Sequence, residues 1–213
     1  MSDEMGLFEA MYSQRALRRL KPGAVPDELV RRLIEAATKA PSGGNREPWA
    51  FMVIRDAASK EKIGEWYLDA WNKTYGVIPD DTRANFPKAF ARVYRSAEHL
   101  AHHVSEVPVL ILVCARDAPQ PDAPQAAVVS YYGSVYPAVQ NLLLAARGLG
   151  LAATLTTLHK LHEDEVKALL GIPETAQTIA LIPVGYPVDK FGPTTRRPPE
   201  EVTHYERWDS SKS

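Results

Sequence analysis

Residues 38–56 read TKAPSGGNREPWAFMVIRD, and they join a predicted helix to a predicted strand. Upstream, residues 27–40 carry apolar side chains at the spacing of one helical face, and Pro41 ends that pattern. Four turn-forming residues follow, Ser42-Gly43-Gly44-Asn45, and the apolar run Trp49–Ile54 then predicts a strand. Glycine has no Cβ, so this turn either lets backbone N–H groups approach a flat or anionic ligand or serves only as a connection.

The composition limits the classes of protein that this chain can belong to. Its 213 residues suffice for one domain with a full core, and the formal net charge of −1 argues against a nucleic-acid-binding or membrane-surface protein. The sequence has no apolar run of about 18 residues and no secretory signal at its N-terminus. The single cysteine, Cys114, lies in an apolar run and cannot build a disulfide framework, so we expect a cytoplasmic protein.

A short basic segment follows the predicted first helix, which ends over Phe8–Tyr12. Arg15, Arg18 and Arg19 lie within five residues and are interleaved with apolar side chains. They form either a solvated face or an anion site, since the planar guanidinium is suited to gripping phosphate.

The section 57–106 is predicted to be largely helical, with a loop over Gly76–Pro87 and a cluster of aromatic side chains. These aromatics form either a satellite core or a lid over an aromatic substrate. His99 and His103 share a helical face, which raises a metal site as a remote alternative to a solvated face.

The second half predicts a strand over 107–115, an apolar helix over 130–150, strands over 151–158 and 178–185, and a helix over 163–170 that Gly171 ends. Pro137 should mark the start of the long helix or a kink in it. The helix is so apolar that it must be central or part of a subunit interface. The polar, proline-rich residues 186–213 predict an extended arm, lying on the body or on a partner, with disorder as the alternative.

In this order and spacing, the motifs resemble the FMN-dependent nitroreductase family over almost the whole chain. The motifs are Arg15-Ala16-Leu17-Arg18-Arg19, Ala40-Pro41-Ser42-Gly43-Gly44-Asn45-Arg46-Glu47-Pro48-Trp49, Tyr136-Pro137-Ala138-Val139-Gln140-Asn141, Gly148–Thr157, Leu169-Leu170-Gly171-Ile172-Pro173, Gly185-Tyr186-Pro187 and Arg196-Arg197-Pro198.

The resemblance implies an α+β, nitroreductase-like three-layer fold with a central mixed sheet flanked by helices. It implies one FMN-binding domain over 1–213, with 57–106 as a variable lid or substrate section and 186–213 as a C-terminal arm. It also implies an intertwined homodimer with FMN at the interface, a symmetric arrangement common among oligomers.

The resemblance implies three groups of FMN-binding residues. The first grips the phosphate and comprises Arg15, Ala16, Leu17, Arg18 and Arg19, with Arg196 from the arm. The second lies against the isoalloxazine from the second subunit and comprises Pro41, Ser42, Gly43, Gly44 and Asn45. The third lies along the polar edge of the ring, near N5, and comprises Leu155, Thr156 and Thr157. Gln14, Ala16, Glu47 and Thr194 depart from residues frequent in the family, which affects the list of flavin contacts.

The activity implied is an NAD(P)H oxidoreductase working by ping-pong hydride transfer through flavin N5. NADH or NADPH is the donor, and nitroaromatic, quinone or similar electron-poor molecules are the acceptors. We expect no catalytic side chain and no metal, because the flavin carries the redox chemistry. Reductive dehalogenation, flavin degradation, a flavin storage or sensing protein and, remotely, a zinc hydrolase remain as alternatives.

Overall fold

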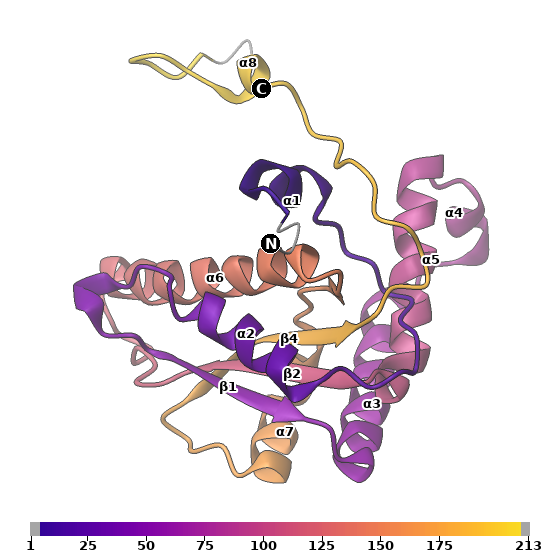
Figure 1. Cartoon of the computed structure of the whole chain (residues 1–213), viewed down its shortest axis with the longest axis horizontal. Coiled ribbons are helices and arrows are strands. Elements are labelled where there is room, and N and C mark those ends of the chain that lie inside the picture. Colours follow the sequence, from indigo (N-terminus) through magenta and orange to yellow (C-terminus); the bar gives the residue numbers. More distant parts are fainter. Residues whose placement is uncertain (1–4, 210–213) are drawn as a thin grey trace.

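The computed structural model describes residues 5–209, and a four-stranded sheet lies at its centre (Figure 1). The strands are β1 (Trp49–Ile54), β2 (Val109–Ala115), β3 (Ala152–Ala153) and β4 (Gln177–Gly185), in the order β1-β2-β4-β3. All three pairings are antiparallel, whereas a mixed sheet was expected. Ile54 at the end of β1 pairs with Leu110 near the start of β2, so the intervening helical section leaves and rejoins the sheet at the same end.

Helices cover both faces of the sheet and give the expected three layers (Figure 1). One face packs against α2 (Asp27–Ala37) and α6 (Gln125–Gly148). The other packs against α3 (Ala57–Trp71), α5 (Lys88–His103) and α7 (Glu163–Leu170). Strand β2 is buried throughout, and its alternate residues enter the two cores, because successive side chains of a strand point to opposite faces. The predicted two-sided burial of this strand is confirmed.

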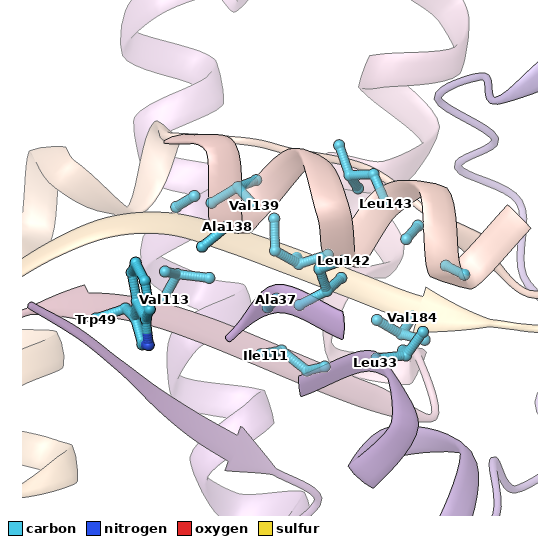
Figure 2. Packing of buried hydrophobic residues seen from close by; sticks show 14 of the residues in the cluster. Leu33, Ala37, Trp49, Ile111, Val113, Ala138, Val139, Leu142, Leu143 and Val184 are labelled. Carbon is cyan, nitrogen blue, oxygen red and sulfur yellow. The ribbon is translucent and has the colours of Figure 1, made fainter. Parts of the chain in front are cut away.

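The first core joins α2, α6 and the sheet (Figure 2). Leu33 and Ala37 of α2 are fully buried at the (i, i+4) spacing, beside Ile111 and Val184 of the sheet. Burial of a side chain the size of Leu33 contributes roughly 1.5–3 kcal/mol. The apolar face read from the sequence of α2 therefore fixes this helix on the sheet.

Helix α6 begins at Gln125, earlier than expected, and continues through Pro137 as one helix. An internal proline removes one backbone hydrogen bond and costs about 3 kcal/mol. Buried side chains lie on both sides of Pro137, including Val135, Ala138 and Leu142, and their burial offsets that cost.

Most aromatic side chains of the section 57–106 belong to the second core, whereas Tyr75 and Phe90 are exposed. The Trp71 and Tyr94 rings lie 5.3 Å apart, and Phe86 and Tyr94 lie 5.5 Å apart. This confirms the satellite core. The predicted loop over 76–87 contains a short helix, α4 (Asp80–Ala84), which follows a π-helical turn, η2 (Asn72–Gly76). Asp80 and Asp81 in the first turn of α4 favour its helical start.

The strand expected over 151–158 is reduced to the two residues of β3 and an isolated bridge between Thr156 and Leu181. The 3-10 turn η4 (Leu158–His162) then leads into α7, which has the predicted bounds. Gly171 ends α7 at φ +66°, a conformation that glycine adopts at little cost.

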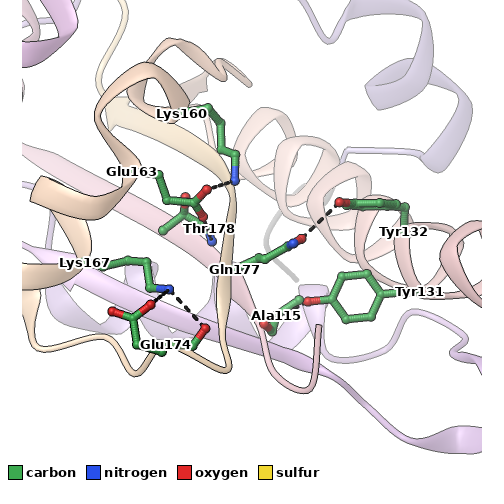
Figure 3. A network of polar contacts seen from close by, with 9 residues as sticks. All are labelled: Ala115, Tyr131, Tyr132, Lys160, Glu163, Lys167, Glu174, Gln177 and Thr178. Carbon is green, nitrogen blue, oxygen red and sulfur yellow. Dashed lines mark hydrogen bonds and ion pairs between the residues drawn. The ribbon is translucent and has the colours of Figure 1, made fainter. Parts of the chain in front are cut away.

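A carboxylate from α7 supports an irregularity in the sheet (Figure 3). The β2–β4 register shifts between Val113 and Cys114, and Glu163 accepts hydrogen bonds from the Thr178 N–H at 2.8 Å and hydroxyl at 2.9 Å. Lys160 pairs with the same carboxylate. Burial opposes ionisation, but the bonds from Lys160 and Thr178 hold the Glu163 pKa below its usual range.

The remaining elements are α1 (Leu7–Ser13), η1 (Gly43–Asn45), η3 (Val104–Glu106) and α8 (Pro199–Val202). The end of the first helix is therefore confirmed. Within the described residues, no helix is both long and apolar enough to cross a membrane.

Candidate functional site

The basic segment lies along the start of the C-terminal arm. The Lys21 N–H donates to the Tyr186 carbonyl at 2.8 Å, and the Val188 N–H donates to the Arg19 carbonyl at 3.0 Å. Farther along, the Thr194 N–H and hydroxyl donate to the Tyr12 carbonyl at 2.8 and 3.1 Å. Residues 12–21 and 186–194 therefore run side by side in opposite directions.

Arg18 is the arginine of this segment whose environment best suits an anion. It is half-buried, and burial lowers the pKa of its guanidinium. Within the described residues it makes one long hydrogen bond, from Nη1 to the Ala16 carbonyl at 3.4 Å. A desolvated cation with donors to spare favours an anionic ligand, because the guanidinium has five N–H donors and no acceptor.

The other arginines differ from Arg18 in their partners. Arg19 is exposed and makes two bonds to the Asp189 carboxylate, at 2.6 and 3.0 Å, which raise its pKa. Arg15 lies against Gly192, where an added Cβ would stand 3.3 Å from its Nη1. Arg196 is exposed and donates to the Thr195 carbonyl at 2.8 Å. Arg19 thus ties the basic segment to the arm, and sequence reasoning did not identify Asp189 as its partner.

The residues predicted for the polar edge of the ring follow β3. The Thr156 backbone exchanges two hydrogen bonds with Leu181, at 3.0 and 2.9 Å, while Leu155 and Thr157 are exposed. The Thr156 hydroxyl contacts the Tyr67 hydroxyl at 2.7 Å.

Tyr67 links the Thr156 segment to the basic segment. Burial raises its pKa, while the bond to Thr156 and the positive charge of Arg18 act in the opposite direction. The Thr154 hydroxyl donates to the Leu17 carbonyl at 3.4 Å, so the segment after β3 lies beside the basic segment, and the structure brings the first and third predicted groups together. The sequence gives only an aromatic residue on a helix at position 67, so its role at the site could not be found from it.

The predicted flavin loop is held against the first half of α6. The Gly43 N–H donates to Ser134 Oγ at 3.0 Å, and a Cβ at position 43 would stand 2.5 Å from Ser130 Oγ. Gly44 has φ +61°, which completes the turn. Position 43 therefore requires glycine for close approach and position 44 for backbone conformation. Ser134, which sequence reasoning missed, gives no local signal of this contact.

The same loop borders a pocket of about 380 Å³, lined by Gly43, Arg46, Pro48, Arg116, Asp117, Pro119, Ala123, Ala127, Tyr131 and Ser134. Arg116 Nη2 donates to the Glu47 carbonyl at 3.1 Å, and this bond connects the glycine loop to the segment that follows β2. Pro41 and Asn45 of the predicted group are exposed, and Ser42 Oγ accepts from the Glu47 N–H at 3.0 Å.

Within one chain, the loop and the basic segment lie apart (Figure 1). The loop contacts Ser134, and the segment preceding Arg15 contacts Arg147, which donates to Ser13 Oγ at 2.8 Å. These two α6 residues are thirteen positions apart, or about 20 Å along the helix axis. A single chain therefore does not bring the second predicted group to the first and third.

Two histidines of α5 contact each other. His99 and His103 stack at 4.2 Å between ring centres, and His103 Nδ1 lies 2.7 Å from the His99 carbonyl oxygen. Across residues 5–209, no group of three or more His, Cys, Asp or Glu side chains is placed to hold a metal ion.

Known proteins resemble this chain in sequence and in fold. The chain is 28% identical to an NADH dehydrogenase of Thermus thermophilus over 202 residues, covering 91% of this chain and 92% of the relative. It is also 28% identical to mouse iodotyrosine deiodinase 1 over 187 residues, covering 84% of this chain and 61% of that longer protein. Its fold matches the crystal structure of oxidised iodotyrosine deiodinase bound to FMN and 3-iodo-L-tyrosine, with a TM-score of 0.70, 25% identity and coverage of 96% and 100% of the two chains.

The model of the Nitroreductase family matches residues 11–186, which include the basic segment, the glycine loop and Thr156. This chain belongs to the Nitroreductase family.

Proposed function

We propose that this protein is an FMN-dependent NAD(P)H oxidoreductase that reduces electron-poor aromatic or quinone-like acceptors. Arg18 carries the proposal, since its guanidinium is half-buried, makes one long hydrogen bond within the described residues and belongs to the segment that contacts Thr154 through Leu17. A phosphate monoester is close to doubly negative at neutral pH and accepts several charge-assisted hydrogen bonds.

The residues present fit FMN in three respects. Arg18, with Arg15 and Arg196 as further cations, binds the phosphate. Thr156, half-buried at the sheet edge, offers a hydroxyl to a polar heterocycle. In the glycine loop, the exposed Gly44 presents backbone without a Cβ, and an added Cβ would meet only the Arg46 side chain within 4 Å, which suits the approach of a flat ring. When bound, FMN supplies the redox chemistry, and the protein supplies binding, orientation and electrostatics.

The separation of the glycine loop from Arg18 supports a homodimer in which each site takes the loop from the second subunit. Exposed apolar side chains provide surface for such an interface. On α1, Phe8 is 66% exposed; on the arm beyond α8, Tyr205 is 80% and Trp208 77% exposed. A second copy is the occupant we propose for these faces, because it also completes the site.

A second candidate reaction is reductive dehalogenation of a halogenated aromatic. The similarity to iodotyrosine deiodinases supports it as the second candidate. In that reaction two electrons and a proton replace a carbon–halogen bond with a carbon–hydrogen bond and release halide.

The test is the visible spectrum of the purified protein with FMN, recorded anaerobically before and after addition of NADH or NADPH. Bleaching of the flavin bands supports the oxidoreductase and identifies the donor. Nitroaromatic, quinone and iodotyrosine acceptors are then compared by the rate at which each restores the bands. Bound flavin that neither nucleotide bleaches indicates a storage or sensing protein, and failure to bind FMN contradicts the proposal.

A further inference from the structure

Tyr67 on α3 and Thr156 after β3 form a pair of hydroxyl groups 2.7 Å apart. Tyr67 is 3% exposed, and its ring belongs to the second core. Thr156 is half-buried and fixed by its two backbone bonds to Leu181. Both partners are therefore held in place, and only their O–H bonds are free to rotate.

The surroundings decide which hydroxyl donates. Each group has one hydrogen and can also accept, so either direction is possible for the isolated pair. Among the described residues, Thr156 Oγ1 is the acceptor within hydrogen-bond distance of the Tyr67 hydroxyl. A buried O–H left without an acceptor is costly, so Tyr67 donates to Thr156 Oγ1. The hydrogen of Thr156 is then directed away from Tyr67.

We propose that Tyr67 is a positioning residue that presets the Thr156 hydroxyl as a hydrogen-bond donor to the polar edge of the bound cofactor. This inference rests on the proposed function, in which Thr156 faces that edge. It assigns a role to a side chain outside the three groups of residues expected to touch FMN.

The preset direction has a consequence for redox potential. N5 of the isoalloxazine is an acceptor in oxidised FMN and carries a hydrogen in reduced FMN. The bond from Tyr67 polarises the Thr156 hydroxyl, which makes it a stronger donor to N5 of oxidised FMN and a weaker acceptor from N5–H of reduced FMN, so the pair favours the oxidised form. Removal of the Tyr67 hydroxyl takes away this polarisation and favours the reduced form relative to the wild-type protein.

The experiment compares the Tyr67→Phe variant with the Tyr94→Phe variant. Tyr94 is a matched control because it is also buried, belongs to the same second core and donates to a backbone carbonyl, that of Tyr75, at 3.2 Å. The FMN midpoint potential of Tyr67→Phe is expected to shift to more positive values than that of the wild-type protein, and its flavin absorption bands to move. Tyr94→Phe is expected to retain both wild-type values.

A double-variant cycle separates positioning from packing. Thr156→Val removes the hydroxyl that Tyr67 directs, so the change Tyr67→Phe should have no further effect on the potential in that background. Thr156→Ser keeps a hydroxyl and should preserve the response to Tyr67→Phe. Thermal unfolding of the FMN-free variants checks that each one folds.

The outcomes distinguish the inference from the function on which it rests. If the wild-type protein binds FMN and NAD(P)H bleaches it, but Tyr67→Phe matches Tyr94→Phe, the positioning role is wrong and the oxidoreductase stands. An equal shift from Tyr67→Phe in the Thr156→Val background also overturns the role. If the wild-type protein does not bind FMN, both the function and the inference fail.

Discussion

The guanidinium of Arg147, near the end of α6, lies 4.2 Å from the centre of the Phe191 ring in the arm. Its Nε also donates to Ser13 Oγ, so one side chain joins α6, the end of α1 and the arm. A cation over an aromatic face contributes about 0.5–1 kcal/mol at exposed sites, and a hydrogen bond from a charged donor adds about 1.5–3 kcal/mol.

Replacement of Arg147 with alanine is therefore expected to loosen the arm without unfolding the core. The measurement is the rate of tryptic cleavage after Lys190 and Arg196 in FMN-free protein, which should rise several-fold. Phe191→Leu is a second variant, and its effect should overlap with that of Arg147→Ala because both remove the same contact. Additive effects of the two changes would show that the contact does not hold the arm.

The different partners of Arg18 and Arg19 predict different roles. Arg18→Ala should weaken FMN binding by roughly 10- to 100-fold, the range for the loss of a charge-assisted hydrogen bond. Arg19→Ala removes the pair with Asp189 and should affect FMN less. Equilibrium titration of each variant with FMN makes the comparison, and equal losses would contradict the assignment of Arg18 as the principal anion-binding arginine.

Arg196→Ala tests the placement of the arm. It should weaken FMN retention while leaving the dimer intact, because this exposed guanidinium bonds only to the neighbouring carbonyl of Thr195 in the described contacts. FMN affinity and sedimentation of the variant give the two readouts. An unchanged FMN affinity would count against a phosphate contact from the arm.

The close approach of Gly43 to α6 predicts that position 43 does not tolerate a larger side chain. Gly43→Ala places a Cβ 2.5 Å from Ser130 Oγ, and overpacking of this kind costs about 1–3 kcal/mol. Ser130→Ala in the same chain removes the clashing atom and should restore most of the loss. Gly133→Ala is the control, since nothing lies within 4 Å of its added Cβ and alanine favours a helix. Thermal unfolding measures all three, and a harmless Gly43→Ala would mean that the loop shifts freely.

Local patterns predicted the elements whose structure depends on neighbours in sequence. The helix over 163–170 has its predicted bounds because its start and its Gly171 end are both local signals, and the strand over 49–54 follows Pro48 directly. The course of α6 through Pro137 could not be predicted, because it depends on burial against α2 and the sheet.

In the candidate site, too, local sequence identifies the residues, whereas the fold determines their contacts. Arginines and glycines in short motifs identify its candidate residues, but their partners come from distant segments. Asp189 lies 170 positions from Arg19, and Thr156 lies 89 from Tyr67. No periodicity links such positions, so the distinction between Arg18, with donors to spare, and Arg19, held by a carboxylate, requires the folded chain.

His159 predicts how stability depends on pH. It is 1% exposed, and among the described residues neither ring nitrogen has a hydrogen-bond partner. Burial, with a smaller effect from Lys160, lowers its pKa to about 4. The unfolded chain has a histidine pKa near 6.5, so between about pH 6.5 and 4 the unfolded state binds more protons, and stability falls as the pH is lowered. The loss of unfolding free energy reaches about 3 kcal/mol near pH 4, at 1.36 kcal/mol per pH unit.

His159→Leu should flatten this part of the curve of unfolding free energy against pH, whereas His102→Leu, at an exposed position, should not. Urea denaturation at a series of pH values from 7 to 4 makes the measurement, and parallel curves for the wild-type and His159→Leu proteins would show that acid destabilisation arises elsewhere.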